Sequence, residues 1–165
     1  MSRRSRRPPR ATNVVAPLAT FVGRDEVLDA IAAHFERGDR LVTLVGPPGI
    51  GKTRTAVRFA ESRAAAFLAE GGVWFCDLTE ALDSNALCAA VAHSLRVRLP
   101  SEPDADAAIE FIGDELAHRG AILIVLDNFE QLPRSAAACV ARWCGVAPDA
   151  CVLVTSRERL AIPGE

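Results

Sequence analysis

The sequence contains little of what several classes of protein require. Among its 165 residues there is no tyrosine and one methionine, and aromatic residues make up only 5%. No stretch approaches the ~20 consecutive apolar residues that a membrane-spanning helix needs. The five cysteines include no C-x-x-C pair and the three histidines are scattered, so neither a disulfide framework nor a zinc site is expected. We therefore expect a cytoplasmic protein with reduced thiols and no membrane contact.

A large excess of charge of either sign is also absent. The formal net charge is −2, so the chain as a whole has no reason to coat nucleic acid or an anionic membrane. The exception is local, because five arginines lie within the first ten residues without the apolar segment that a secretory signal would require. We expect residues 1–16 to form a disordered basic arm, since a charged, proline-rich run cannot bury enough apolar surface to offset its ordering entropy. A specific nucleic-acid contact is the less favoured alternative.

Lysine is nearly absent, and the one lysine present is therefore informative. Among 19 basic residues only Lys52 is a lysine. A compact ammonium on a flexible stem fits between phosphate oxygens, whereas a planar guanidinium group does not fit that space. Lys52 lies in the segment GPPGIGKT at residues 46–53, which matches the phosphate-binding pattern G-x-x-x-x-G-K-[ST], the P-loop.

The surroundings of this motif favour a P-loop over an ordinary Gly/Pro turn. Apolar residues 41–45 predict a strand before it, and helical spacing predicts a helix from Lys52 to Gly71 after it. In this order, backbone N–H groups and the helix N-terminus face one anionic ligand. We expect Lys52 to bridge the β- and γ-phosphates of ATP and Thr53 to offer its hydroxyl to Mg²⁺. The predicted nucleotide-binding residues of this segment are Gly46, Pro47, Pro48, Gly49, Ile50, Gly51, Lys52, Thr53 and Arg54.

The rest of the chain alternates short apolar runs with helical patterns. Further strands are predicted at residues 73–76, 121–126 and 151–154, and the uninterrupted run 121–126 is typical of a strand covered on both faces. This alternation predicts a three-layer α/β fold with a parallel sheet. We divide the chain after the arm into a linker and helix at residues 17–38 and a nucleotide-binding core at residues 39–165.

Three helix starts are predicted from local signals. Ser84 is expected to cap one helix, and Ser101 and Asp104 to form a capping box that opens another. Pro133 is expected in the first turn of a third helix, which ends near Gly145.

Asp127 ends the apolar run 121–126 and completes the predicted metal site. A carboxylate held at the C-terminal end of a strand is what the Mg²⁺ shell of a P-loop site requires, so Thr53 and Asp127 are the predicted metal ligands. Asn128 follows where many P-loop ATPases have the glutamate that activates water, and an amide cannot accept that proton. Glu130 is close enough in sequence to replace this base, although a solvated surface carboxylate is the favoured interpretation.

Arg157 follows the last predicted strand. Ligands of open α/β sheets bind outside the carboxyl ends of the strands, so Arg157 is a candidate for contact with a γ-phosphate. The alternative is a surface arginine beside Glu158 and Arg159. The candidate catalytic residues are Asp127, Asn128, Glu130 and Arg157.

Five motifs occur in order: FVGRDEVLDAI, GPPGIGKTRTAVRFA, GGVWFCDL, ILIVLDNFEQL and VLVTSRERLAIPGE. Together they resemble the nucleotide-binding core of the STAND-class signalling ATPases, relatives of the NB-ARC and AAA+ groups. The resemblance covers nearly all of residues 16–165 and is strongest to large bacterial transcriptional regulators of the LuxR or SARP type. It implies that Val22, Gly23 and Arg24 line the adenine pocket and that Arg157 senses the γ-phosphate. It also implies an ADP-bound resting state and an ATP-bound active state that self-associates.

Members of the resembled family continue with a fifth strand, a helical lid and output domains. The chain is therefore expected to be a fragment or truncated product, with DNA contacted only through an output domain. The resemblance implies the strand order 5-1-4-3-2. Without strand 5, the uncharged, β-prone residues 41–45 would form an exposed edge, and self-association or marginal solubility is expected.

These observations predict an ATP- or ADP-Mg²⁺ binding module that acts as a nucleotide-dependent switch in a transcriptional regulator, with slow or no hydrolysis. A catalytically active AAA+ ATPase of the origin-initiator or remodelling kind is the alternative, and Asn128 counts against it. An interaction module that has kept an unused P-loop is the third reading, and the intact Lys52, Thr53 and Asp127 count against that.

Overall fold

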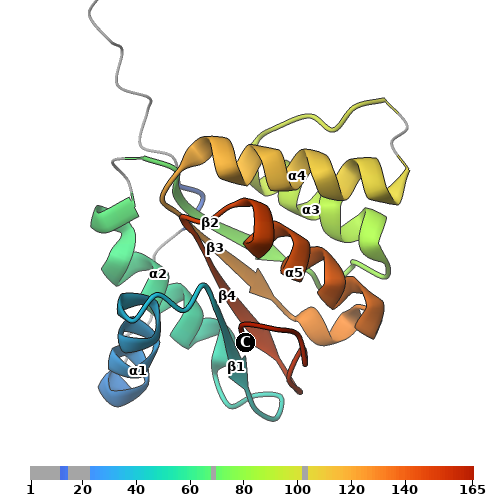
Figure 1. The fold of residues 1–165 in the computed structure, drawn as a ribbon. Coiled ribbons are helices and arrows are strands. Elements are labelled where there is room, and N and C mark those ends of the chain that lie inside the picture. Colours follow the sequence, from blue (N-terminus) through green and yellow to red (C-terminus); the bar gives the residue numbers. More distant parts are fainter. Residues whose placement is uncertain (1–11, 15–22, 68–69, 102–103) are drawn as a thin grey trace, which may run out of the picture.

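A four-stranded parallel sheet lies between two layers of helices in the computed structural model, which describes residues 12–14, 23–67, 70–101 and 104–165 (Figure 1). The order across the sheet is β1-β4-β3-β2. The strands are β1 (Leu41–Val45), β2 (Gly72–Asp77), β3 (Ile122–Asp127) and β4 (Ala150–Ser156). The predicted three-layer α/β fold is confirmed, and the strands occur in the order 1-4-3-2 that the resemblance implied for them.

The helices divide between the two faces of the sheet. Figure 1 shows α1 (Asp25–Glu36) and α2 (Lys52–Phe67) on one side. On the other side lie α3 (Ser84–Leu95), α4 (Ala105–Arg119) and α5 (Ala137–Val146). Successive strand residues point to opposite faces, so each strand contributes to two separate apolar cores.

Strand β3 shows this division most clearly. All six of its residues are buried, because β2 and β4 flank it and helices cover both faces. Leu123 and Val125 pack with α2, whereas Ile122, Ile124 and Leu126 belong to the core under α3, α4 and α5. The strand predicted from residues 121–126 is therefore confirmed as central to the fold, and it ends at Asp127.

Two of the predicted helix caps are wrong, one by a single residue and the other by three residues. The N-cap of α3 is Asp83 rather than Ser84, because the Asp83 carboxylate accepts a hydrogen bond from Ala86 N at 2.8 Å. The N-cap of α4 is Asp104 itself, which accepts from Ala107 N at 2.8 Å. Asp104 therefore does not occupy the third helical position that a capping box with Ser101 requires.

The segment after Pro133 also differs from its prediction. Pro133 precedes a short 3₁₀ helix, η2 (Arg134–Ala136), and α5 begins only after it, at Ala137. The fixed φ of proline suits either helix type at this place, so the sequence signal marked the start of helical backbone without specifying its type.

Residues 12–14 cover part of the outer edge of β2. Thr12 forms a parallel bridge with Val73. The Asn13 side chain donates to Phe75 O at 2.8 Å and accepts from Phe75 N at 2.7 Å, so one amide satisfies both backbone groups of an edge residue. These three residues belong to the segment expected to be disordered. The remainder of the predicted basic arm lies outside the described residues.

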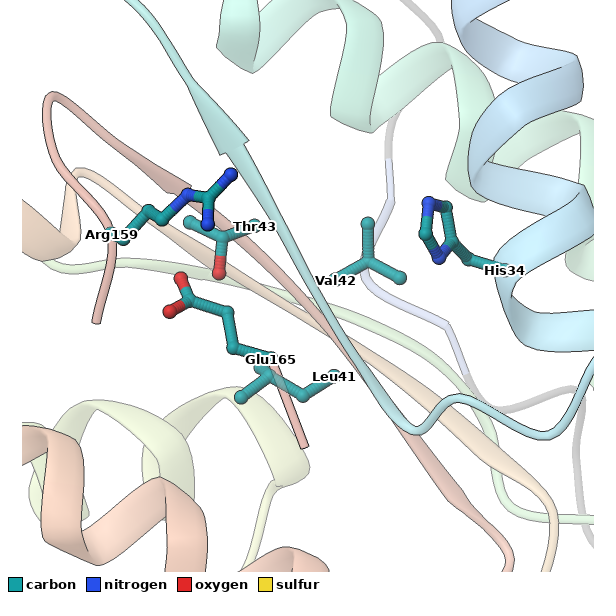
Figure 2. Close-up of a pocket in the computed structure, with 6 residues that line it drawn as sticks. All are labelled: His34, Leu41, Val42, Thr43, Arg159 and Glu165. Carbon is teal, nitrogen blue, oxygen red and sulfur yellow. The ribbon is translucent and has the colours of Figure 1, made fainter. Parts of the chain in front are cut away.

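The opposite edge of the sheet, β1, borders a cavity of about 190 Å³ (Figure 2). Leu41, Val42 and Thr43 line it together with His34, Arg159 and Glu165. In Figure 2, Thr43 lies near Arg159 and Glu165, whereas Val42 points toward His34. The Glu165 carboxylate accepts from the backbone N–H groups of Leu160 and Ala161, which folds these last residues into a turn. The predicted edge at residues 41–45 is thus flanked by side chains along part of its length.

No helix in the described part of the chain is both long enough and apolar enough to cross a membrane. All five cysteines are free thiols. Burial raises the pKa of Cys76 to about 12, as expected for a thiol that packs as a small apolar side chain.

Candidate functional site

The P-loop joins β1 to α2 and has the backbone geometry that phosphate binding requires. Gly49 and Gly51 have φ values of +78° and +90°, which side chains with a Cβ rarely adopt. The loop ends where α2 begins, at Lys52. The N-terminus of this 16-residue helix therefore faces the loop, as the sequence predicted.

Lys52 is folded over the loop that precedes it. Its Nζ donates to Gly46 O at 2.8 Å and to Pro47 O at 3.2 Å. The ammonium carries three N–H donors, so a third remains for an acceptor in the mouth of the loop. The only lysine of the chain is thus positioned by the two first residues of the motif.

Thr53 connects the P-loop helix to the central strand. Its hydroxyl lies 2.9 Å from Asp127 Oδ1 and 3.0 Å from Asp127 Oδ2, although the two residues are 74 positions apart. Asp127 ends β3 and is only 2% exposed. The two predicted metal ligands are therefore in direct contact.

Thr155 also holds Asp127 and was missed by the sequence reasoning. This buried residue of β4 donates to Asp127 Oδ1 at 2.6 Å and accepts from Asn128 N at 3.1 Å. Burial raises the pKa of Asp127, while the hydrogen bonds from Thr155 and Thr53 oppose that rise. The signal that could have identified Thr155 in the sequence is a hydroxyl residue near the carboxyl end of a strand that lies beside β3.

Asn128 lies beside Asp127 in a left-handed conformation, with φ of 63°, which asparagine tolerates better than most residues. Its Nδ2 contacts three oxygens, one each from Asp77, Thr79 and Asp127. Hydrogen bonds, first of all from the Thr79 side chain, lower the pKa of Asp77. Asp77 and Thr79 were not among the predicted site residues.

Glu130 and Arg157 form an ion pair, with Arg157 Nε 3.2 Å from Glu130 Oε1. The Glu130 side chain is only 11% exposed, so the favoured interpretation of a solvated surface carboxylate is wrong. Its Oε2 is buried and has no hydrogen-bond partner in the described part of the chain. Arg157 is 57% exposed and lies just beyond β4.

Arg24 reaches the P-loop from the start of α1. Its guanidinium donates to Thr55 Oγ1 at 3.2 Å and to Ile50 O, and it packs against Gly51. Arg24 has a φ of +70°, a conformation that costs energy in a non-glycine residue and that clusters at functional sites. Gly23 precedes it with a φ of +79°.

A cation such as Mg²⁺ fits the oxygen donors of this arrangement. It prefers one or two carboxylates and hydroxyl or water oxygens, together with phosphate oxygens of the ligand, and Thr53 and Asp127 offer a hydroxyl and a carboxylate side by side. Within the described ranges no group of three or more His, Cys, Asp or Glu residues forms another candidate metal site.

A family model described as the AAA domain matches residues 34–149. This range includes the P-loop, the Thr53–Asp127 contact and Asn128. The chain belongs to the AAA domain family.

Relatives of this AAA domain occur in mycobacteria. A Mycobacterium tuberculosis protein named "Putative HTH-type transcriptional regulator" is 37% identical over 130 residues, which is 77% of this chain and 14% of that protein. An uncharacterized protein of the same species is 32% identical over 148 residues, which is 90% of this chain and 36% of that protein. The chain therefore spans 14% and 36% of the lengths of these relatives.

Solved structures share the fold of the AAA domain at low sequence identity. Cdc6p from Pyrobaculum aerophilum has a TM-score of 0.65 and 19% identity, over 82% of this chain and 39% of that chain. Aeropyrum pernix ORC1, solved in complex with DNA, has a TM-score of 0.61 and 24% identity, over 92% of this chain and 42% of that chain. Aeropyrum pernix ORC2, described with ADPNP–ADP complexes, has a TM-score of 0.61 and 15% identity, over 82% and 41%. These likenesses confirm the α/β fold.

The AAA domain brings most of the predicted site residues to one end of the sheet. The P-loop residues 46–53, Asp127 and Asn128 come together through the contacts above, and Arg24 reaches the loop from the start of α1. Arg157 makes its described contact with Glu130 rather than with the P-loop. Arg54 lies in the first turn of α2, and Val22 lies outside the described residues.

Proposed function

We propose that this AAA domain binds ATP and ADP together with Mg²⁺ at the P-loop. The observation that carries the proposal is the contact between Thr53 and Asp127, which joins the phosphate-binding helix to the central strand. A hydroxyl and a buried carboxylate at this place have little structural reason to meet unless they share a ligand, because burying the carboxylate raises its pKa and therefore costs stability.

The loop supplies the complementary positive surface. Backbone N–H groups at Gly49 and Gly51 and the N-terminus of α2 favour an anion, and Lys52 adds a full charge. Lys52 would exchange its present carbonyl partners, Gly46 O and Pro47 O, for phosphate oxygens, which are charged acceptors and form stronger bonds. The related fold of Aeropyrum pernix ORC2, described with ADPNP–ADP complexes, supports this assignment.

We further propose that the site works as a nucleotide-dependent switch with slow or no hydrolysis. Asn128 offers an amide where a general base would be needed, and it uses its NH₂ group on Asp77, Thr79 and Asp127. In this proposal Arg157 senses the γ-phosphate, whereas Gly23 and Arg24 lie on the adenine side of the site. The linker comprises residues 17–38 and the nucleotide-binding core residues 39–165. The mycobacterial relative named as a regulator supports a role in transcription. In this proposal DNA is bound elsewhere in the whole protein, and the ATP state self-associates.

Calorimetry with and without Mg²⁺ tests the binding, and a single-turnover assay tests the switch. Both nucleotides are expected to bind, more tightly with Mg²⁺, and turnover is expected to lie far below ~1 s⁻¹, the lower end of the ordinary enzyme range. Absence of nucleotide binding in the wild-type chain would overturn the first statement. A turnover rate within the enzyme range would overturn the second.

An active ATPase is the second candidate, and the low exposure of the Glu130 side chain favours it. The Glu130 side chain is only 11% exposed, and its Oε2 has no hydrogen-bond partner among the described residues, so this oxygen is available to accept a proton from water. If turnover is found, Glu130→Gln is expected to abolish it while leaving ADP affinity unchanged. Equal turnover in wild type and Glu130→Gln would exclude Glu130 as the base.

A further inference from the structure

The side chain of Asn128 is held by the ends of two neighbouring strands. Its Nδ2 lies 2.9 Å from Thr79 Oγ1, 3.2 Å from Asp127 Oδ2 and 3.3 Å from Asp77 Oδ1. Asp77 is the last residue of β2 and is paired in register with Asp127, the last residue of β3. One NH₂ group therefore faces three oxygens that come from both strand ends.

The chemistry of these oxygens fixes the direction of each hydrogen bond. Ionised carboxylates only accept, so the nitrogen of the Asn128 amide, and not its oxygen, must face Asp77 and Asp127. The Thr79 hydroxyl donates to Asp77 Oδ1 at 2.5 Å, and Thr79 N donates to the same oxygen at 2.9 Å. The hydroxyl oxygen of Thr79 is then free to accept from Asn128, and the orientation of the amide is determined by its surroundings.

This amide in turn fixes the carboxylate that the proposed metal site needs. Asp127 Oδ1 accepts from Thr53 and Thr155, and Oδ2 accepts from Thr53 and Asn128. Without the Asn128 amide, Thr53 would be the one remaining donor to Asp127 Oδ2 among the contacts above. The carboxylate could then turn away from the P-loop helix. Positioning of a metal ligand by a second layer of hydrogen bonds commonly affects metal affinity by 10- to 100-fold.

We propose that Asp77 and Thr79 are positioning residues of the nucleotide site, which hold the Asn128 amide so that it orients the Asp127 carboxylate toward Thr53. The inference rests on the proposed nucleotide and Mg²⁺ site. It also explains the residue type at position 128, because a carboxylate there would place a third negative charge against Asp77 and Asp127. The neighbours of this position thus select an amide over an acid.

A coupling experiment tests the proposal on the full 165-residue chain. Nucleotide affinity is measured with Mg²⁺ and with EDTA in wild type, Asp77→Ala, Asn128→Ala and the double variant. Asp77→Ala is expected to weaken binding roughly tenfold in Mg²⁺, the lower end of the effect of losing a residue that positions a metal ligand, and by less than about twofold in EDTA. In the Asn128→Ala background the same substitution is expected to have almost no further effect, because its target is already absent.

Two further variants separate positioning from a local structural role. Asp77→Asn keeps an acceptor oxygen and is expected to retain the Mg²⁺-dependent affinity within about twofold, while Thr79→Val is expected to follow Asp77→Ala. Asp83→Ala is the matched control, because Asp83, like Asp77, accepts a hydrogen bond from a backbone N–H, but it does so as the cap of α3 and does not hold Asn128. Asp83→Ala is expected to lower the stability of the domain and to leave unchanged the ratio of nucleotide affinity in Mg²⁺ to that in EDTA.

Equal losses with Mg²⁺ and EDTA, or equal losses in wild-type and Asn128→Ala backgrounds, would overturn the proposal and leave Asp77 as a turn residue. If wild type binds no nucleotide, the proposed function fails, but the positioning can still be judged by NMR. The side-chain NH₂ signals of Asn128 are expected to be slow to exchange with water in wild type and to lose this protection in Asp77→Ala. Unchanged signals in that variant would overturn the positioning role independently.

Discussion

Substitution of Lys52 is the most direct test of nucleotide binding at the P-loop. Its ammonium is held at the mouth of the P-loop by two carbonyl oxygens, 2.8 and 3.2 Å away. Lys52→Ala is expected to weaken ATP binding tenfold or more, because each charge-assisted hydrogen bond contributes ~1.5–3 kcal/mol. Isothermal titration calorimetry measures this loss.

The matched control for Lys52 is Arg58→Ala. Arg58 is a cation on the same helix, but its side chain is half exposed and pairs with Glu61 at 3.6 Å. Its removal is expected to leave ATP affinity unchanged. If both substitutions reduced affinity equally, the P-loop assignment of the lysine would be wrong.

Arg157 is expected to discriminate between the two nucleotides. In the structure its guanidinium binds Glu130, so a γ-phosphate would have to compete with this carboxylate. Arg157→Ala is expected to reduce the ratio of ATP to ADP affinity while leaving ADP binding nearly intact, since only ATP offers a γ-phosphate. Competition titrations with both nucleotides measure the ratio.

Arg134→Ala serves as the comparison for Arg157, because Arg134 also forms an exposed ion pair, with Glu158 at 3.0 Å. It should not change the ratio of ATP to ADP affinity. Equal losses of ATP and ADP affinity in Arg157→Ala would indicate a structural arginine.

Among the elements, α4 offers a test of which residue begins the helix. The structure places the cap at Asp104, whose carboxylate accepts from Ala107 N. Asp104→Ala is expected to lower the free energy of unfolding by about 1 kcal/mol. The midpoint of thermal unfolding should fall by about 2–4 °C for a domain of this size. Circular dichroism follows the transition.

Ser101→Ala distinguishes the two assignments of this cap. If Ser101 opened the helix, as the sequence predicted, its substitution would carry the stability loss and Asp104→Ala would cost little. The structure predicts the reverse, because Asp104 immediately precedes the first helical residue, Ala105.

The P-loop element was predicted more accurately than the caps, for a physical reason. Its function depends on one contiguous segment of eight residues in which glycine spacing and a single lysine are all visible in the sequence. A helix cap depends on a choice among neighbouring polar residues that have similar propensities, such as Asp83 and Ser84. The difference in free energy between such choices is small, so sequence alone places the boundary only within a few residues.

At the scale of the whole molecule, the two edges of the sheet are protected differently. The Asn13 side chain covers part of the β2 edge through two hydrogen bonds to the backbone of Phe75. The β1 edge pairs only with β4 among the described strands, and Val45 is 48% exposed at its end. Apolar edge strands promote pairing between chains, so the isolated 165-residue chain is expected to self-associate through β1. Size-exclusion chromatography with light scattering across a dilution series measures the association.

A charge at the β1 edge should reduce this association. Val45→Lys is expected to shift the chain toward the monomer, whereas the matched substitution Val146→Lys should not. Val146 is similarly exposed, at 54%, but lies at the end of α5, away from the edge. A clean monomer in the wild-type chain would show that Arg159 and Glu165 already protect the edge in Figure 2.

The sequence by itself determined the fold class and the centre of the site. Alternating strand and helix patterns, the run that ends at Asp127, and the glycine and lysine spacing of the P-loop are local properties, and they predicted the parallel sheet and the end of it at which the candidate site lies. The membership in the AAA domain family agrees with that reading.

Only the tertiary structure decided which other side chains reach this centre. Asp77 and Thr155 are 50 and 28 positions from Asp127, and although both lie within motifs that carried the resemblance, neither residue was assigned a role in the site from the sequence. They meet Asp127 or Asn128 because parallel strands end at the same edge of the sheet, and this register is set by packing of the whole core. The low exposure of the Glu130 side chain, 11%, was likewise decided by tertiary structure, because it depends on how the chain after β3 packs beside Arg157.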